Sequence, residues 1–343
     1  MNKIDLKSLE IDELKKVFIN LGEKEFRGKQ TFGWIHEKCI NDIDKITVLS
    51  KPLKQKLNEN YKITNLKIVK RYDSKIDGTK KYLFSLEDGN IIESVMMKHR
   101  HGVTVCLSTQ VGCRMGCSFC ASTKEGLVRN LEPSEILEQF YSIQKDINEK
   151  ISNIVLMGSG EPLDNYKNVL TFLKLIHDEN GQNLSYRNIT LSTCGVVPKI
   201  YELADEGIPV NLSISLHSPF DDERKKIMPI SNKYSIEEIL EACKYYIDKT
   251  KRRITFEYTL IDGVNDSEEY AIEITKLLKG MLSHVNLIPL NTIKEFKHTK
   301  SLDKSIEKFK NILEKRGVNT TIRREMGSDI NAACGQLRRD YIN

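Results

Sequence analysis

Three cysteines within eight residues form the group with the clearest potential for chemistry. Cys113, Cys117 and Cys120 follow the spacing C-x-x-x-C-x-x-C in the run VGCRMGCSFCAS. A structural zinc site takes four protein ligands, and an ordinary iron-sulfur cluster takes four cysteines. Three thiolates on one short loop therefore predict a [4Fe-4S] cluster with one iron left open for a substrate. A zinc site completed by a distant Cys or His is one alternative, and three neutral buried thiols are another.

A glycine-containing run, MGSGEP at residues 157–162, follows an expected strand. Its glycines would let a ligand approach the backbone closely. A strand-to-helix turn also commonly needs glycine, so this run does not define a site by itself. It is not a dinucleotide-binding fingerprint, because Leu163 stands where the last glycine would be required.

Polar residues also follow three later strands. Ser192 ends the third expected strand, Ser215, Leu216 and His217 end the fourth, and Asn291 follows the sixth. Active-site residues in parallel α/β folds lie at the carboxyl ends of strands. A single histidine at a strand end is usually structural, but several polar ends at one barrel mouth could hydrogen-bond the ribose and adenine of a nucleoside cofactor.

The elements that must position these residues alternate between short β-rich runs and amphipathic helical stretches. Helices are expected at residues 133–147, 166–179, 235–248 and 268–282, where apolar residues recur at helical spacing. Six βα units are too few for a closed eight-stranded barrel, so the sequence predicts an α/β fold with a partial (β/α)6 barrel. The six strands and a later extended segment are expected at residues 103–108, 153–158, 188–193, 210–216, 254–260, 285–289 and 320–323.

Residues 1–97 follow a different pattern and are expected to form a small α+β accessory domain ahead of the core at residues 98–343. Two helical stretches precede strands joined by turns at Asp77-Gly78 and Asp88-Gly89. Residues 1–100 contain 21 Lys/Arg against 15 Asp/Glu, so the basic excess of the chain is amino-terminal. This asymmetry fits a polyanion-binding module, although clustered lysines on a small domain are more often only a solvated face.

Composition places the chain among ordinary globular proteins. It has 343 residues, of which 39% are hydrophobic and 29% charged. No stretch approaches 18 consecutive apolar residues and the start is polar, so a cytoplasmic protein with no membrane contact is expected. The eight cysteines show no evenly spread framework, which favours metal or catalytic use over structural disulfides.

Taken together, the motifs resemble the RlmN/Cfr family of radical S-adenosylmethionine (SAM) RNA adenosine methyltransferases over nearly the whole chain. In the amino-terminal part, FRGKQTFGWI is more similar to RlmN, which methylates carbon 2 of adenosine, than to Cfr, which methylates carbon 8. After Pro289 the chain has Leu290, Asn291 and Thr292 where many RlmN sequences have Trp-Asn-Pro. The matching segments are CLSTQVGCRMGCSFCAS, LVRNL, MGSGEPLDN, LSTCGVVP, SISLHSP, MPI and DINAACGQL.

The resemblance implies a role for each of five cysteines. The cluster on Cys113, Cys117 and Cys120 would bind and cleave SAM. A first SAM would methylate Cys334, and a second would give the radical that activates this methyl group for addition to the base. Cys106 would then release the product by forming a transient disulfide with Cys334. The matching base that removes the carbon 2 proton is Glu93, for which the alternative is an ordinary solvent-facing strand residue.

The resemblance also implies ligands and partners. Gly160 and Glu161 would contact the SAM amino group, and the polar strand ends would hold its nucleoside. The substrates would be 23S rRNA at the peptidyl transferase centre and tRNA at the adenosine 3′ of the anticodon, with a donor such as flavodoxin or ferredoxin supplying electrons to a monomer. Carbon-8 methylation and a non-catalytic zinc RNA-binding protein remain the alternatives. Phosphate contacts are expected from Arg323, Arg324, Arg338 and Arg339.

Overall fold

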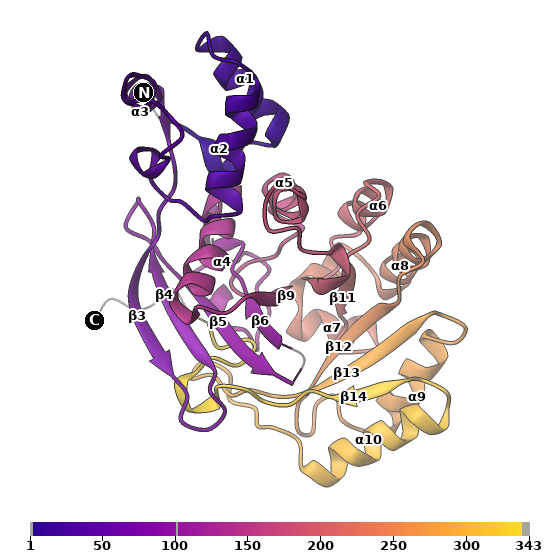
Figure 1. The fold of residues 1–343 in the computed structure, drawn as a ribbon. Helices are drawn as coiled ribbons and strands as arrows, with labels where there is room; N and C mark the ends of the chain where they lie inside the picture. The colour runs from indigo at the N-terminus through magenta and orange to yellow at the C-terminus, as the bar shows by residue number, and fades with distance from the viewer. Residues whose placement is uncertain (1–2, 101, 338–343) are drawn as a thin grey trace.

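The computed structural model describes residues 3–100 and 102–337. A mixed sheet of ten strands forms the centre of the molecule (Figure 1). Its order is β14-β13-β12-β11-β10-β9-β6-β5-β4-β3, and the pairs from β6 to β14 are all parallel. The predicted α/β fold with a partial barrel is confirmed.

The parallel strands follow the sequence prediction closely. The residues on their helix-covered face are almost all aliphatic or aromatic and buried, as packing against helices requires. The late extended segment is a seventh parallel strand and the edge of the sheet. The strands are β6 (Gly102–Cys106), β9 (Ile151–Leu156), β10 (Ile189–Thr193), β11 (Asn211–Ser215), β12 (Ile254–Leu260), β13 (Ser283–Pro289) and β14 (Thr320–Ile322).

Helices cover the outer face of the parallel strands (Figure 1). The first begins at Pro133, where a missing N–H is tolerated, and Glu132 and Glu135 form a reciprocal capping box. The six helices are α4 (Pro133–Ile147), α5 (Tyr166–His177), α6 (Val197–Asp205), α8 (Ile236–Thr250), α9 (Glu268–Leu277) and α10 (Asp303–Lys315).

The amino-terminal part adds antiparallel strands to the same sheet. The strands β3 (Lys67–Asp73), β4 (Lys80–Ser85) and β5 (Ile91–His99) pair in sequence, and β5 then pairs with β6. Hydrogen bonds therefore run without a break across residue 97. The helical portion comprises α1 (Ile11–Asn20), α2 (Phe26–His36) and α3 (Lys51–Asn60), and a two-stranded parallel sheet joins β1 (Ile4–Asp5) to β2 (Tyr61–Lys62).

Buried polar contacts fix this helical portion to α4. The ammonium of Lys7 is fully buried, pairs with the carboxylate of Glu138 and donates to the carbonyl of Thr64 at 2.5 Å. The His36 ring Nδ1 lies 2.8 Å from the hydroxyl of Tyr141. A charge pair taken out of water tolerates the loss of neither partner, so these contacts favour one orientation of the two parts.

Two elements near the cysteines were not expected from the sequence. A short antiparallel ribbon of β7 (Gln110–Gly112) and β8 (Leu127–Asn130) encloses the cysteine loop. A short helix, α7 (Asp221–Ile227), follows β11. Its sequence, DDERKKI, has the charge density of a solvated face, which concealed its packing role.

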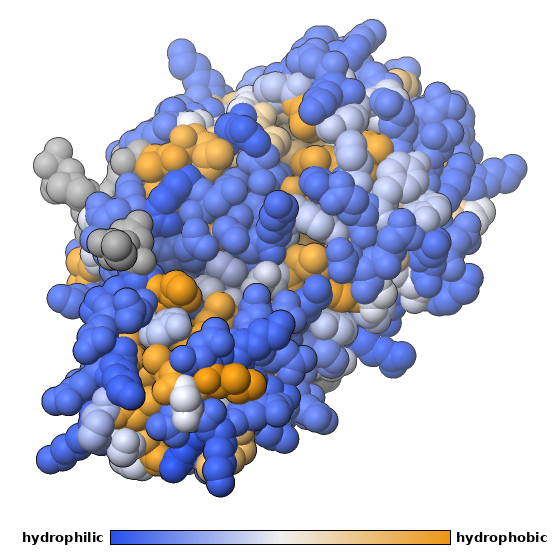
Figure 2. Space-filling model, turned by 90° about the horizontal axis from the view of Figure 1, so that it is seen from above, coloured by the Kyte–Doolittle hydropathy of each residue, from blue (hydrophilic) through white to orange (hydrophobic). Residues whose placement is uncertain are grey.

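The surface seen from above is mostly hydrophilic, with separate hydrophobic patches (Figure 2). Exposed large apolar side chains in the helical amino-terminal portion include Ile19 and Phe26. Within residues 3–100 and 102–337, no helix combines the length and apolar character that crossing a membrane demands.

The close contact of α1 and α2 gives a stability prediction. A Cβ added at Gly28 of α2 would lie 2.6 Å from the Cα of Lys15 and 2.8 Å from its nitrogen. Gly28→Ala should therefore lower the free energy of unfolding by about 1–3 kcal/mol.

Gly33→Ala in the same helix is the matched control, because the atom nearest to the added Cβ would be 3.7 Å away. It should be neutral or stabilising by up to about 1 kcal/mol. Equal denaturation midpoints for the two variants would contradict the packing argument.

Candidate active site

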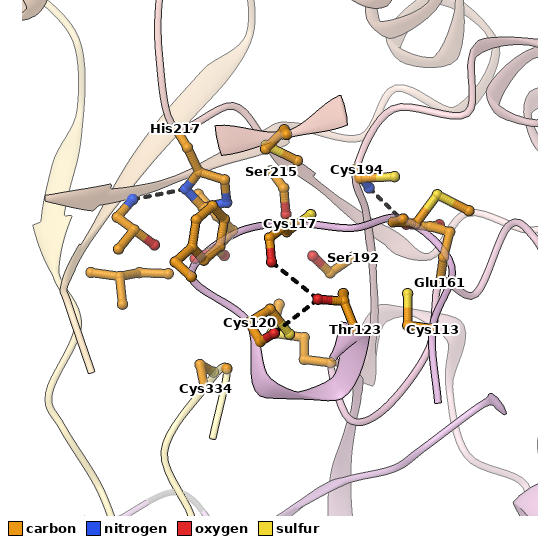
Figure 3. Close-up of a pocket in the computed structure, with 18 of the residues that line it drawn as sticks. Cys113, Cys117, Cys120, Thr123, Glu161, Ser192, Cys194, Ser215, His217 and Cys334 are labelled. Atoms are coloured by element: carbon orange, nitrogen blue, oxygen red, sulfur yellow. Dashed lines mark hydrogen bonds between the residues drawn. The ribbon is translucent and has the colours of Figure 1, made fainter. Parts of the chain in front are cut away.

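A cavity opens at the carboxyl ends of the parallel strands, where the sequence placed the site. It holds about 920 Å³ of empty space, including its open mouth. The three loop cysteines approach it from one side and the polar strand ends from the other (Figure 3). Among the predicted site residues, the ones that line it are Cys113, Cys117, Cys120, Gly160, Glu161, Ser192, Ser215, His217, Asn291 and Cys334.

The cysteine loop is held in shape by its own backbone and by α7. The Thr123 hydroxyl lies 3.2 Å from the carbonyl of Cys117 and 3.0 Å from that of Cys120. The Ser118 N–H donates to the carbonyl of Ile227 at the end of α7 at 2.9 Å. These contacts present the three thiols to the cavity without using them as structural donors.

Burial keeps these thiols protonated in the absence of a metal. It raises the pKa of Cys113 to about 12 and also raises the pKa of Cys117 and Cys120. A metal centre that binds thiolates displaces these protons. The three thiols therefore stay protonated until a metal centre binds to the loop.

The donor set of the loop fits a cluster. Its three cysteines all line the cavity and are free thiols. Three thiol donors around an open cavity, with hydrogen-bonding groups opposite, suit a cluster with one open position.

The MGSGEP turn packs tightly against the base of the cysteine loop. Gly160 has a φ of +105°, and a Cβ there would lie 2.6 Å from the Cβ of Gln110. The N–H groups of Cys194 and Leu163 donate to the Glu161 carboxylate at 2.8 and 3.0 Å. Burial raises the pKa of Glu161, and these donors oppose the rise. The carboxylate is thus positioned rigidly at the cavity wall.

His217 faces the cysteine loop as a neutral donor. Its Nδ1 accepts the N–H of Thr259 at 2.9 Å, so the proton of the neutral ring is on Nε2. Burial lowers the pKa of His217 to about 3. Its ring packs edge-on against Phe119, with centroids 4.8 Å apart. Of the other strand ends, Ser192 and Ser215 also face the cavity, whereas Leu216 is buried behind it.

A second cavity lies on the open side of the barrel. Residues of β5 and β6 line one of its walls, and residues that end or follow β13 and β14 line another. Cys106 and Cys334 both line it, and Cys334 also lines the first cavity. Asn291 donates to the Cys334 carbonyl at 3.0 Å and holds that loop at the boundary. Burial, with Cys334 nearby, raises the pKa of Cys106 to about 12.

The positions of two charged residues at the cavities were not predicted from the sequence. Arg323, expected only as a phosphate contact, lines both cavities, and its Nη1 is 3.8 Å from the Glu257 carboxylate. Glu257 was missed altogether. The signal was available, because a carboxylate inside the apolar strand ITFEYTL is buried and needs a partner. Burial raises the pKa of Glu257, and Arg323 opposes that rise.

Glu93 is buried rather than solvent-facing. Its carboxylate pairs with the Lys81 ammonium at 3.2 Å and is not among the groups that line either cavity. Strand alternation puts it on the same side of β5 as Val95, which lines the second cavity. Arg324 also lines that cavity, whereas Arg338 and Arg339 lie outside the described residues.

Comparison with known proteins agrees with this site. The model of the radical SAM superfamily matches residues 107–274, and that of the ribosomal RNA large subunit methyltransferase N-terminal domain matches residues 4–63. A crystal structure of a radical SAM methyltransferase from Sphaerobacter thermophilus superposes with a TM-score of 0.94 at 41% identity, covering 98% of this chain and 100% of the other. The fold and site are therefore those of a radical SAM methyltransferase.

Similarity to curated proteins identifies the family within the class of radical SAM methyltransferases. A probable dual-specificity RNA methyltransferase RlmN of Clostridium novyi is 59% identical, with 97% of each chain covered. The corresponding protein of Clostridioides difficile is 58% identical over 99% of this chain and 98% of its own length. The chain belongs to the RlmN family of dual-specificity RNA methyltransferases, whose radical SAM chemistry uses SAM and a [4Fe-4S] cluster. Membership in this family shows that the protein is an enzyme. It excludes the alternative of a non-catalytic zinc protein.

Replacing any one of Cys113, Cys117 or Cys120 by Ala should abolish iron binding, because two thiolates do not hold a cluster securely. The fold should survive, since the loop lies outside the main hydrophobic core. Iron and sulfide analysis after anaerobic reconstitution measures the loss, and circular dichroism checks the fold. Cys39→Ala is the control, because Cys39 lies in the amino-terminal portion and should leave the iron content unchanged. Full iron content in a loop variant would refute the cluster assignment.

The neutral state of His217 predicts a pH effect on stability. The unfolded chain binds a proton near pH 6.5, whereas the folded ring resists it until about pH 3. Stability from this group is thus complete above pH 6.5 and falls by about 1.4 kcal/mol per pH unit as the pH drops toward 3. His217→Gln retains an acceptor for Thr259 and should show a shallower loss in denaturant titrations between pH 6.5 and 5. Parallel slopes for the two proteins would show that His217 is not held neutral.

Proposed function

We propose that this protein methylates carbon 2 of an adenosine in 23S rRNA, at the peptidyl transferase centre, and of the adenosine 3′ of the anticodon in tRNA. The observation that carries this proposal is the position of Cys334 at the boundary of two cavities. A residue there faces the SAM site on one side and space for an RNA base on the other. The dual-specificity name of the relatives supports two RNA substrates.

The first cavity is assigned to the cofactors. When bound, the cluster and SAM supply the methyl group and the one-electron chemistry that removes a hydrogen atom from it, at two SAM molecules per turnover. Glu161 and Gly160 are assigned to the SAM amino group. His217 Nε2–H, with Ser192 and Ser215, provides donors for the nucleoside part. A one-electron donor such as flavodoxin or ferredoxin completes the system.

Cys334 is assigned as the carbon carrier. Its thiolate would take the methyl group of SAM: a bond from the Cys334 sulfur to the methyl carbon forms, the bond from the SAM sulfur to that carbon breaks, and S-adenosylhomocysteine leaves. After loss of a hydrogen atom this carbon adds to carbon 2 of the adenosine. Arg323 lies within electrostatic reach of Cys334 and lines both cavities, so its guanidinium stands beside the sulfur that takes the methyl group.

Cys106 and Glu93 are assigned to product release. Glu93 takes the proton from carbon 2, and the adduct radical would return one electron to the one-electron system that supplied it, which leaves a closed-shell sulfur–carbon adduct. Lys81 links Glu93 to the carrier loop by donating to the Asn331 carbonyl at 3.3 Å. Cys106 then attacks the Cys334 sulfur. A sulfur–sulfur bond forms, the sulfur–carbon bond breaks, and its electron pair goes to the product carbon, which takes a proton to become methyl. An external thiol reduces the disulfide for the next turnover.

RNA contacts are assigned to residues 1–97 and to Arg324 at the second cavity, with residues 98–343 as the catalytic core. The adenosine must leave its stack to enter this cavity, which costs a few kcal/mol and is easiest in a loop.

The two cysteines should give opposite phenotypes. Cys106→Ala keeps the carrier but not the resolving thiol, so protein joined covalently to RNA should accumulate in cells. Cys334→Ala should form neither methylcysteine nor adduct. Mass spectrometry of nuclease-treated protein identifies the increment on Cys334, and nucleoside analysis of wild-type reactions should give 2-methyladenosine. An adduct in Cys334→Ala protein would sink these assignments, and 8-methyladenosine would point to Cfr-type chemistry.

A further inference from the structure

A buried guanidinium lies behind the cysteine loop. Arg224 of α7 is fully buried and is among the largest completely enclosed side chains of the protein. All its hydrogen bonds go to uncharged acceptors at 2.8–2.9 Å. These acceptors are the carbonyls of Leu216, Ser215 and Cys194 and the hydroxyl of Ser231.

The charge of Arg224 is left uncompensated by this arrangement. Within residues 3–100 and 102–337, no carboxylate lies within 4.0 Å of it. Asp221, at the start of the same helix, accepts the N–H of Ile236 at 2.9 Å and reaches Arg224 only at longer range. A buried cation without a counter-ion is costly, and burial accordingly lowers the pKa of Arg224. A negative charge close to Arg224 would offset this cost.

The neighbouring cysteine loop would supply such a charge once its thiolates hold a cluster. The Arg224 guanidinium is bonded to the carbonyl of Cys194, and Cys194 packs with Cys117, Ile227 and Met228 in one apolar cluster. The helix that carries Arg224 also accepts the N–H of Ser118 through Ile227. Arg224 is therefore fixed to the scaffold of the loop, directly behind one of its thiols.

We propose that Arg224 is the counter-charge of the cluster and a positioning residue that makes the cluster easier to reduce. The inference rests on the assignment of the cluster to Cys113, Cys117 and Cys120. Reduction adds one negative charge to a cluster already negative through its thiolates. A buried cation stabilises the more negative state, because the potential of such clusters follows local charge and hydrogen bonding. The electron comes from the one-electron donor of the reaction.

The same contacts explain why Arg, rather than Lys, stands here. The guanidinium fork bonds the ends of β10 and β11 at once, whereas an ammonium supplies fewer and less directed donors. A purely structural role would depend on these bonds. An electrostatic role depends on the charge.

Three variants separate the two roles. Arg224→Met removes the charge, Arg224→Lys keeps it with fewer bonds, and Ser231→Ala removes one bond and keeps it. The cluster potential is measured in reconstituted full-length protein by a redox titration followed by electron paramagnetic resonance. Arg224→Met should be at least tenfold harder to reduce, a downward shift of about 59 mV or more. The other two should stay within threefold of wild type.

Ser231→Asp covers the case in which Arg224→Met does not load iron. A carboxylate at this position would neutralise the guanidinium in place, so its potential should also fall. Loss of iron from Arg224→Met and Ser231→Asp, with iron kept in Arg224→Lys, would equally support a need for the charge. Unchanged potentials in loaded variants, or iron loss in Arg224→Lys as well, would overturn the inference. A wild-type protein without a reducible cluster would instead overturn the cluster assignment.

Discussion

The site depends on one constraint, which is that an irregular carboxyl-terminal loop must hold Cys334 at a fixed place between two cavities. The loop has no sheet to fix it, so its backbone is bonded from three sides. The Ala121 N–H donates to the Gly335 carbonyl at 2.7 Å, and Asn291 donates to the Cys334 carbonyl. From the β3–β4 turn, the Asp77 carboxylate accepts the N–H of Gly327 at 2.8 Å. The cysteine loop, the barrel and the amino-terminal strands thus all help to hold the thiol of Cys334 in place.

Burial decides how the cysteines behave before the cofactors arrive. The high pKa values of Cys106 and Cys113 keep their thiols neutral, and all eight cysteines are unpaired in the structure. Reactivity is therefore conferred by a partner, either a metal or a nearby charge, rather than by the thiol itself. The concentration of charged groups at the cavity boundary, with Arg323 and Glu257 facing each other, is consistent with that division.

The parallel strands were predictable because each is a short apolar run between turn residues, and polar strand ends marked the cavity mouth correctly. Spacing alone singled out the three loop cysteines as candidate cluster ligands, and all three line the cavity. Glu257 and Arg224 escaped because local pattern does not reveal what a buried charge contacts. Arg224 lies in a charge run that looks solvated, and only the folded chain brings three carbonyls to it. Glu93 was predicted as the base through family resemblance and stays a prediction, and its pairing with Lys81 depends on strand register that local sequence does not specify.

The central claim is that the transferred carbon passes through Cys334 and loses a hydrogen atom on the way. Reaction with SAM carrying a fully deuterated methyl group tests this directly, by mass spectrometry of the methyladenosine released from RNA. A carrier mechanism predicts a product methyl that retains two deuterium atoms and gains one hydrogen from water. A product that retains all three deuterium atoms would mean direct transfer from SAM to the base and would contradict the account.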